Sequence, residues 1–339
     1  MNKGICTIVS LNYFAQAMSL MKNVKKYHQE AELHVLLVDK VQDDKVAQKL
    51  NDYKGVATLY SVEEIGIEDI TSMAFKYDVV ELNTAVKPYF MEFLLEKYQY
   101  DNLMYIDADI LLFHRLDRVY EELEKHSVIL TPHLLSVEED MDTSISKTQD
   151  FLRFGIYNLG FIAVRNNEAG RKAICWWKEK LHDKCYLDKD EFLAWDQKWM
   201  DFAPALLDDV YVLRDPGYNV AFWNMQGRFI SQKDGEYYVN ENFPLVFYHF
   251  SHYRLTQKDR IAAVELRSRC TPLAERKDLE PLFQIYYQSV MENDYEFFSR
   301  VPYGYACYEN GDVISKEDRK EYKELLESGK EAGSDPFLV

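Results

Sequence analysis

The stretch LMYIDADILLF, residues 103–113, places two aspartates, Asp107 and Asp109, inside an otherwise apolar run. The run predicts a buried strand, and charged side chains are rarely buried without a partner. Two residues that are i and i+2 on a strand share one face, so both carboxylates are expected to point the same way unless a turn interrupts the strand. Hard oxygen ligands suit Mg²⁺ or Mn²⁺. The stretch therefore predicts a divalent-cation site at a strand end, and a solvated turn is the alternative.

Outward from this stretch, short apolar runs alternate with segments of helical spacing. The expected strands are 4–11, 33–38, 56–60, 127–131, 156–165, 209–214 and 244–250. The expected helices are 14–27, 43–52 and 167–183, and residues 83–97 are expected to contain a helix with Pro88 in its first turn, where a missing N–H costs little. This rhythm predicts βαβ units and a largely parallel sheet in an α/β fold. A glycine inside the strand 156–165, Gly160, predicts a close backbone approach.

Three other segments have simpler patterns. Residues 134–150 are polar and acidic without a period, which predicts a surface loop. Residues 256–300 are expected to be helical. Ser315 and Asp318 form a capping-box pattern for a final helix that is expected to stop at Gly329.

Composition limits the class of partner and the compartment. The 339 residues carry a formal charge of −17, which disfavours a nucleic-acid partner, although a bound metal can reverse the field locally for an anionic ligand. Five scattered cysteines without a CxxC pair predict free thiols in a reducing compartment. The first 20 residues lack a signal-peptide pattern, and no apolar stretch reaches 18 residues. The expected location is the cytoplasm, with peripheral attachment at the inner face of the membrane as an alternative.

Further motifs accompany the two aspartates. They are ELNTAVKP at 81–88, LTPH at 130–133, YNLGF at 157–161, RDPGYNV at 214–220 and YHFS at 248–251. With YIDADI, these motifs resemble GT-A glycosyltransferases, above all family 8, which includes bacterial galactosyltransferases and glycogenin. The chain also resembles bacterial polysaccharide-cluster glycosyltransferases. The likeness runs from Ile5 to about Tyr253.

The resemblance implies a GT-A fold, with a Rossmann-like nucleotide-binding half, a mostly parallel central sheet and C-terminal helices. It implies a catalytic domain over 1–255, divided into a nucleotide-binding half (1–113) and a sugar and acceptor half (114–255). Residues 256–339 would be a helical extension, leading in a longer protein into a further domain. The implied activity is metal-dependent transfer of a hexose from a nucleoside-diphosphate sugar, with UDP expected, to a glycan or lipid-linked glycan in bacterial surface polysaccharide synthesis. Likeness to family 8 favours retention of the anomeric configuration.

The resemblance also implies a metal site. Asp107 and Asp109 correspond to the DxD motif, and His249 to a late histidine that supplies a third ligand to Mn²⁺ or Mg²⁺, with His252 as the substitute. The chain departs from the family here, because HFSHYR at 249–254 lacks the glycine and the Lys-Pro-Trp of the usual motif. Arg254 or Lys258 would then have to contact phosphate.

The nucleotide-sugar would contact several other residues. The loop after the first strand, with Ser10, Asn12 and Tyr13, would hold base and ribose, or else would simply cap the next helix. Lys87 would lie near the diphosphate, Asp107 would also contact the nucleotide-sugar, and a surface lysine is the alternative reading of Lys87. Asn158 and Gly160 would shape the sugar pocket.

Trp195-Asp196-Gln197 resembles the start of the family's Asp-Gln-Asp element, with Lys198 at its third position. Asp196 would bind sugar hydroxyls, and Gln197 would stabilise the oxocarbenium-like centre. The alternative for Asp196 is a helix N-cap. An inverting enzyme would need a carboxylate base, for which Asp196, Asp201 and Asp215 are the candidates.

Two other functions remain as alternatives. A nucleotidyltransferase would be expected to carry a glycine-rich, basic loop after the first strand, but residues 10–16 read SLNYFAQ. A catalytically inactive glycan-binding module would not need the acids at 107 and 109.

Overall fold

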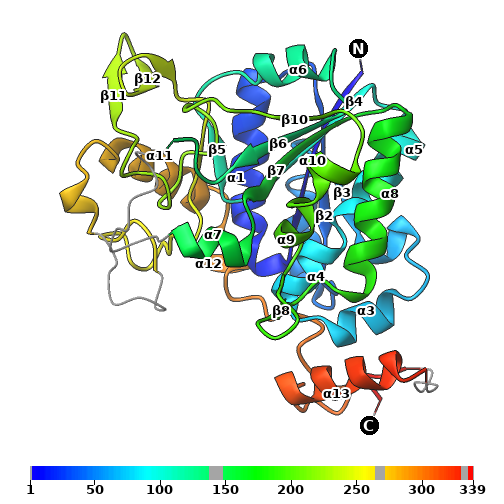
Figure 1. Cartoon of the computed structure of the whole chain (residues 1–339). Coiled ribbons are helices and arrows are strands. Elements are labelled where there is room, and N and C mark those ends of the chain that lie inside the picture. Colours follow the sequence, from blue (N-terminus) through cyan, green and yellow to red (C-terminus); the bar gives the residue numbers. More distant parts are fainter. Residues whose placement is uncertain (1, 137–147, 264–271, 330–334, 339) are drawn as a thin grey trace.

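The computed structural model describes residues 2–136, 148–263, 272–329 and 335–338. Its centre is a seven-stranded sheet in the order β10-β6-β7-β4-β1-β2-β3 (Figure 1). The strands are β1 (Lys3–Val9), β2 (Glu32–Leu37), β3 (Thr58–Ser61), β4 (Asn102–Ile106), β6 (Val128–Pro132), β7 (Tyr157–Arg165) and β10 (Val210–Val212). Only β7 runs antiparallel to its two neighbours in this sheet. The predicted α/β class with a mostly parallel sheet is confirmed.

Helices cover both faces of the sheet. Strand β1 shows why, because its residues alternate between two cores: Ile5 and Val9 pack on one side, and Cys6 and Ile8 on the other. The first side holds α1 (Phe14–Tyr27), α2 (Asp44–Asn51) and α6 (Asp117–Leu123). The second holds α3 (Ile70–Lys76), α4 (Val79–Ala85), α5 (Lys87–Tyr98) and α8 (Glu168–Asp183). A strand buried on both faces needs the continuous apolar runs seen in the sequence.

The run 103–113 and the segment 83–97 each contain parts of two elements. The run 103–113 is two strands, β4 and β5 (Ile110–Leu112), and β5 leaves the main sheet to pair antiparallel with β14 (Phe247–His249). The two aspartates therefore lie on the turn between strands, where the N–H of Ile110 donates to the carbonyl of Asp107 at 3.1 Å. The helix expected within 83–97 is α5, which begins at Lys87, and residues 83–85 belong to α4, which ends at Ala85. Pro88 does lie in the first turn of α5, as predicted.

The segment 256–300 is less helical than predicted. Its described helices are η3 (Leu273–Glu275), α11 (Glu280–Met291) and α12 (Tyr295–Phe298), so 256–263 and 276–279 form no helix. Pro281 sets the start of α11. The expected loop 134–150 falls mostly outside the described residues, and its end at 148–150 belongs to α7 (Thr148–Phe154) rather than to a loop.

Smaller elements complete the chain. They are η1 (Leu11–Tyr13), η2 (Val62–Ile65), β8 (Leu187–Asp188), β9 (Leu193–Ala194), α9 (Gln197–Met200), α10 (Ala203–Leu206), β11 (Ile230–Lys233), β12 (Glu236–Val239) and β13 (Phe243–Pro244). Cys6, Cys175, Cys185 and Cys307 are free thiols, and Cys270 lies outside the described residues. None of the helices in the described ranges is both long and apolar enough to cross a bilayer.

The last helix, α13 (Lys316–Glu327), packs against α3. Its predicted capping box is present, because Ser315 and Asp318 exchange hydrogen bonds, and Gly329 follows the helix end with φ of 69°. The buried guanidinium of Arg319 donates to the carbonyls of Ala74, Phe75 and Tyr77 at the end of α3. These bonds satisfy carbonyls that a helix end leaves without partners.

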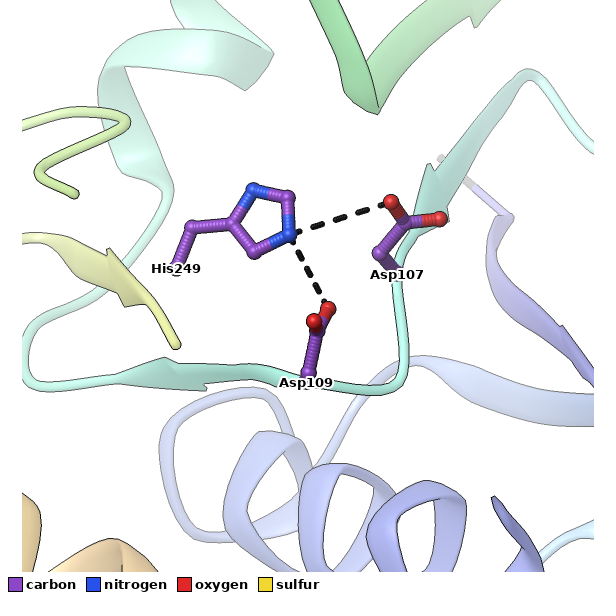
Figure 2. Close-up of side chains that lie close together, drawn as sticks. All are labelled: Asp107, Asp109 and His249. Carbon is purple, nitrogen blue, oxygen red and sulfur yellow. Dashed lines mark ion pairs between the residues drawn. The ribbon is translucent and has the colours of Figure 1, made fainter. Parts of the chain in front are cut away.

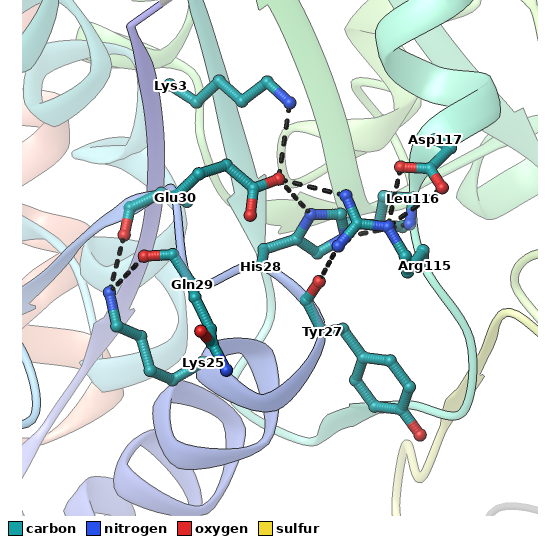
Figure 3. A network of polar contacts seen from close by, with 10 residues as sticks. Lys3, Lys25, Tyr27, His28, Gln29, Glu30, Arg115, Leu116 and Asp117 are labelled. Carbon is teal, nitrogen blue, oxygen red and sulfur yellow. Dashed lines mark hydrogen bonds and ion pairs between the residues drawn. The ribbon is translucent and has the colours of Figure 1, made fainter.

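The end of α1 is tied to the segment that follows β5 (Figure 3). The buried ring of His28 accepts the N–H of Leu116 at Nε2 (2.9 Å), and its Nδ1 lies 3.2 Å from Glu30. Arg115 also contacts Glu30, at 3.1 Å. Because Nε2 accepts a backbone N–H, the neutral ring is the form that fits, and burial lowers the pKa of His28.

Candidate metal centre and donor site

Three side chains converge at the carboxyl end of β4. The Nε2 atom of His249 lies 3.0 Å from Oδ1 of Asp109 and 3.9 Å from Oδ2 of Asp107 (Figure 2). Within the described residues, these three form the group whose ligand atoms lie within 4.8 Å of one another. His252, the substitute ligand, is exposed and outside this group.

Backbone pairing brings the three residues together. Strand β14 pairs with β5, so that His249 lies opposite Ile110, and the N–H of Phe250 donates to the carbonyl of Asp109 at 2.8 Å. The N–H of Asp107 donates to the carbonyl of Gly160 on β7 at 2.7 Å. A Cβ at Gly160 would lie 2.5 Å from Cε1 of His249 and 2.9 Å from Oδ2 of Asp107. The predicted close approach at this glycine is confirmed, because His249 and Asp107 lie against its backbone. We call Asp107, Asp109 and His249 the metal-type cluster.

The electrostatics of the cluster favour an ion pair between Asp109 and His249. Burial disfavours ionisation of Asp109, but the adjacent His249 outweighs it and lowers the pKa of this carboxyl. The same pairing raises the pKa of His249 against the effect of its burial. Without another cation, the histidine thus acts as the counter-ion of Asp109.

The donor set fits a divalent cation. It offers carboxylate oxygens and one imidazole nitrogen, a combination used for Mn²⁺ and, with more water, for Mg²⁺. Ligands about 2.1 Å from an ion lie roughly 3–4 Å apart, and the three ligand atoms are already within 4.8 Å of one another. Asp107 is further held by the hydroxyl of Tyr105, which donates to Oδ1 at 2.5 Å.

Behind Asp107 lies a buried ion pair that involves two predicted site residues. The ammonium of Lys87 is 3.0 Å from Oδ2 of Asp196 and 3.6 Å from Oδ1 of Asp107, and it donates to the carbonyl of Leu159 at 3.1 Å. Lys87 is 5% exposed, so the surface-lysine alternative is wrong. Burial acts to lower the pKa of Lys87, but the carboxylates of Asp107 and Asp196 together have the larger effect, so the pKa is raised. The N-cap alternative for Asp196 is also wrong, because its side chain makes no cap hydrogen bond.

Asn158 and Gln197 lie on the other side of His249. Oδ1 of Asn158 is 3.1 Å from Nδ1 of His249, and Nδ2 of Asn158 donates to Oε1 of Gln197 at 3.0 Å. One connected group thus contains eight of the site residues predicted from the sequence: Asp107, Asp109, His249, Asn158, Gly160, Lys87, Asp196 and Gln197.

The loop after β1 is a separate part of the site. Ser10 donates to Asn12 at 2.6 Å, and Tyr13 is 48% exposed. Because β1 and β4 are parallel neighbours, this loop and the metal-type cluster lie at the same edge of the sheet. Arg254 is exposed, and the ammonium of Lys258 lies 3.8 Å over the ring of Tyr287.

Asp39 also belongs to this region, although its sequence context did not single it out as a site residue. Its buried carboxylate accepts the N–H groups of Leu11 (3.0 Å), Lys40 (2.9 Å) and Gly304 (2.7 Å). The available signal was an acid directly after the apolar run LHVLLV at 33–38. His133 was also missed as a site residue, although it was quoted in a motif. Its buried ring lies 3.4 Å from Nδ2 of Asn158.

The sequence of the chain is similar to those of two other bacterial proteins. No family model matches the chain. It is 27% identical over 270 residues to the uncharacterized protein YfnF of Bacillus subtilis (strain 168), a match that covers 79% of this chain and 88% of YfnF. It is 24% identical over 257 residues to the uncharacterized protein YfnD of the same strain, covering 75% of this chain and 79% of YfnD.

Among solved structures, the chain is similar in fold to the galactosyltransferase LgtC in complex with donor and acceptor sugar analogues. The TM-score is 0.51 at 15% identity, and the match covers 84% of this chain and 95% of LgtC. The chain has a GT-A glycosyltransferase fold. The fold predicted from the motifs is confirmed, and in this glycosyltransferase fold the cluster of Asp107, Asp109 and His249 is the candidate divalent-metal centre.

Proposed function

We propose that the protein transfers a hexose from a nucleoside-diphosphate sugar, UDP-hexose in particular, to a glycan or lipid-linked glycan acceptor. The observation that carries this proposal is the convergence of Asp107, Asp109 and His249 at the carboxyl end of β4 in a GT-A fold. Ligands of open α/β sheets bind at this end of the strands. The solved structure of LgtC with donor and acceptor sugar analogues supports the same two substrate classes here.

The three residues would hold Mn²⁺ or Mg²⁺. When bound, the cation neutralises the leaving diphosphate. The charge of Lys87 would compensate that of Asp107, since its ammonium lies 3.6 Å from Oδ1 of this residue. Ser10, Asn12 and Tyr13 would hold the base and ribose at the adjacent strand end. Asp196, Asn158 and Gly160 would border the sugar.

The engaged carboxylates support retention of the anomeric configuration. Asp196 is paired with Lys87, and Asp201 accepts from the N–H of Ile156 at 2.7 Å and from Lys198 at 2.8 Å. Asp215 is paired with Arg118 at 2.6 Å. An inverting enzyme needs a carboxylate base beside the acceptor hydroxyl, and these three candidates are each committed elsewhere.

The biological setting follows from the same proposal. The substrates would be those of bacterial surface polysaccharide synthesis, at the cytoplasmic face of the membrane. Residues 1–255 would form the catalytic domain, with 256–339 as its extension.

A donor panel tests the function. The protein is incubated with Mn²⁺ and individual UDP- and GDP-sugars, with water as the acceptor of the sugar, and nucleotide release is measured with and without EDTA and in parallel with added pyrophosphate. We expect release of UDP from one UDP-hexose in Mn²⁺ and none in EDTA. A nucleotidyltransferase would instead consume pyrophosphate with the sugar nucleotide, and a glycan-binding module would release no nucleotide. Full release in EDTA would contradict the metal-dependent mechanism.

A further inference from the structure

A chain of hydrogen-bonded side-chain amides connects the metal-type cluster to nearby backbone groups. Starting from His249, it runs through Asn158 to Gln197. Nδ1 of His249 faces Oδ1 of Asn158 at 3.1 Å, and Nδ2 of Asn158 faces Oε1 of Gln197 at 3.0 Å. Asn158 is 6% exposed and His249 is 3% exposed, so water cannot easily replace these partners.

The far end of the chain has a fixed polarity. Oε1 of Gln197 accepts from the backbone N–H of Leu159 at 3.4 Å, and Nε2 of Gln197 donates to the backbone carbonyl of Phe154 at 3.4 Å. A backbone N–H can only donate and a carbonyl can only accept. These two groups therefore determine which end of the Gln197 amide points toward Asn158, and the choice does not rest on an arbitrary assignment of amide atoms.

A second anchor imposes the same polarity on Asn158. Nδ1 of His133 lies 3.1 Å from the carbonyl of Ile156, so this nitrogen carries the hydrogen and Nε2 keeps a lone pair. That lone pair faces Nδ2 of Asn158 at 3.4 Å. Both hydrogens of the Asn158 amide then have acceptors, Gln197 and His133, which leaves its oxygen for His249.

We propose that Gln197 and His133 are positioning residues that act through Asn158 to set the tautomer of His249. With the Asn158 oxygen held against Nδ1, the ring keeps a hydrogen there, so a cation that displaces the Nε2 hydrogen shared with Asp109 would find the Nε2 lone pair between Asp107 and Asp109. Only a lone pair can bind a metal ion, and a reversed Asn158 amide would favour the hydrogen on Nε2 instead. The inference rests on the proposed function, and it assigns Gln197 a role in building the metal centre rather than contacting the reacting sugar.

The two roles of Gln197 predict different results. A contact with the sugar predicts that Gln197→Met lowers turnover and leaves Mn²⁺ affinity unchanged. The positioning role predicts weaker Mn²⁺ binding without any substrate. Loss of an orienting partner of a ligating histidine usually costs about 10- to 100-fold in affinity, and Gln197, one residue further away, should fall near the lower end.

A double-mutant cycle makes the test sharp. In Asn158→Asp, both side-chain oxygens accept, so no amide polarity remains for Gln197 to set. We expect Gln197→Met to weaken Mn²⁺ binding about tenfold in the wild-type background and to have no effect in the Asn158→Asp background. Mn²⁺ dissociation constants are measured by electron paramagnetic resonance, with Gln48→Met on the exposed face of α2 as the control.

An unchanged Mn²⁺ affinity in Gln197→Met, or an equal loss in both backgrounds, would overturn the positioning role. Should Gln197→Met not fold, ¹⁵N NMR of the metal-free wild-type protein, at a pH high enough for His249 to be neutral, still decides, since a hydrogen on Nε2 of His249 contradicts the proposal and a hydrogen on Nδ1 supports it. If the wild-type protein releases nucleotide with Mn²⁺ but shows no coupling, the positioning role alone fails. If it neither binds Mn²⁺ nor uses any donor, the proposed function fails and the positioning role fails with it.

Discussion

The ammonium of Lys87 and the carboxylate of Asp196 form a buried ion pair, 3.0 Å apart, with their side chains 7% and 4% exposed. Removal of one partner of such a pair leaves an uncompensated buried charge, which costs about 3–5 kcal/mol. We therefore expect Lys87→Ala to lower the free energy of unfolding by several kcal/mol as well as weakening nucleotide binding. Urea denaturation measures the first effect. The double variant Lys87→Met/Asp196→Asn should recover much of the loss, and a fully stable Lys87→Ala would refute the burial of this pair.

The second prediction concerns Gly160, because a methyl group there would clash with both His249 and Asp107. Gly160→Ala should displace one or both ligands and weaken Mn²⁺ binding on the order of tenfold or more. Gly55→Ala is a matched control, since a Cβ at Gly55 has nothing within 4 Å. Equal Mn²⁺ affinities in the two variants would show that the approach at Gly160 is not tight.

The third prediction concerns acid stability and His28. Burial lowers the folded-state pKa of His28, so the unfolded chain binds more protons as the pH falls below about 6.5. Stability from this residue is therefore present at pH 7 and is lost as the pH falls toward the folded pKa. His34 acts in the same direction, because burial lowers its pKa to about 4.

His28→Gln isolates the contribution of His28, because the amide can still accept the N–H of Leu116 and donate to Glu30 without titrating. We expect the wild-type protein to lose more stability between pH 7 and 5 than this variant does. Urea midpoints across that range measure the difference. Parallel pH profiles would mean that His28 is protonated in the folded protein.

The fourth prediction concerns the attachment of α13. Arg319 donates to carbonyls of Ala74, Phe75, Tyr77 and Tyr305, all as buried charge-assisted bonds. Arg319→Met should cost at least about 2 kcal/mol of unfolding free energy, because these carbonyls lose their donor. Lys320→Met, one position away and exposed, should cost little. Thermal unfolding of the two variants compares them directly, and equal melting temperatures would contradict this attachment.

The sequence predicted the sheet well where strands are buried on both faces, as in residues 4–11 and 33–38. The prediction from sequence failed where one buried apolar run contains two strands that pair with different neighbouring strands. Residues 103–113 are apolar throughout, but β4 and β5 pair in different sheets, and no local pattern records that change. The hairpin of β11 and β12 was overlooked although Asp234-Gly235, both with positive φ, is a typical two-residue turn signal.

The candidate site was predicted in the same uneven way. Asp107, Asp109 and His249 were identifiable from motifs, and the structure brings them together. The partners of Lys87 and Gln197 were not, because contacts such as Lys87 with Asp196 join residues 109 positions apart. Asp39 was overlooked because its role, holding Leu11 and Gly304, depends on a contact with the distant C-terminal segment.

The most direct test of the account is UDP affinity with and without Mn²⁺, measured by calorimetry on the wild-type protein and on Asp109→Asn, with the exposed Asp259→Asn as control. If the cation links Asp107, Asp109 and His249 to the diphosphate, Mn²⁺ should tighten UDP binding at least about tenfold in the wild type and the control. The same addition should have little effect in Asp109→Asn. Equal UDP affinity with and without Mn²⁺ in the wild-type protein would contradict the central claim.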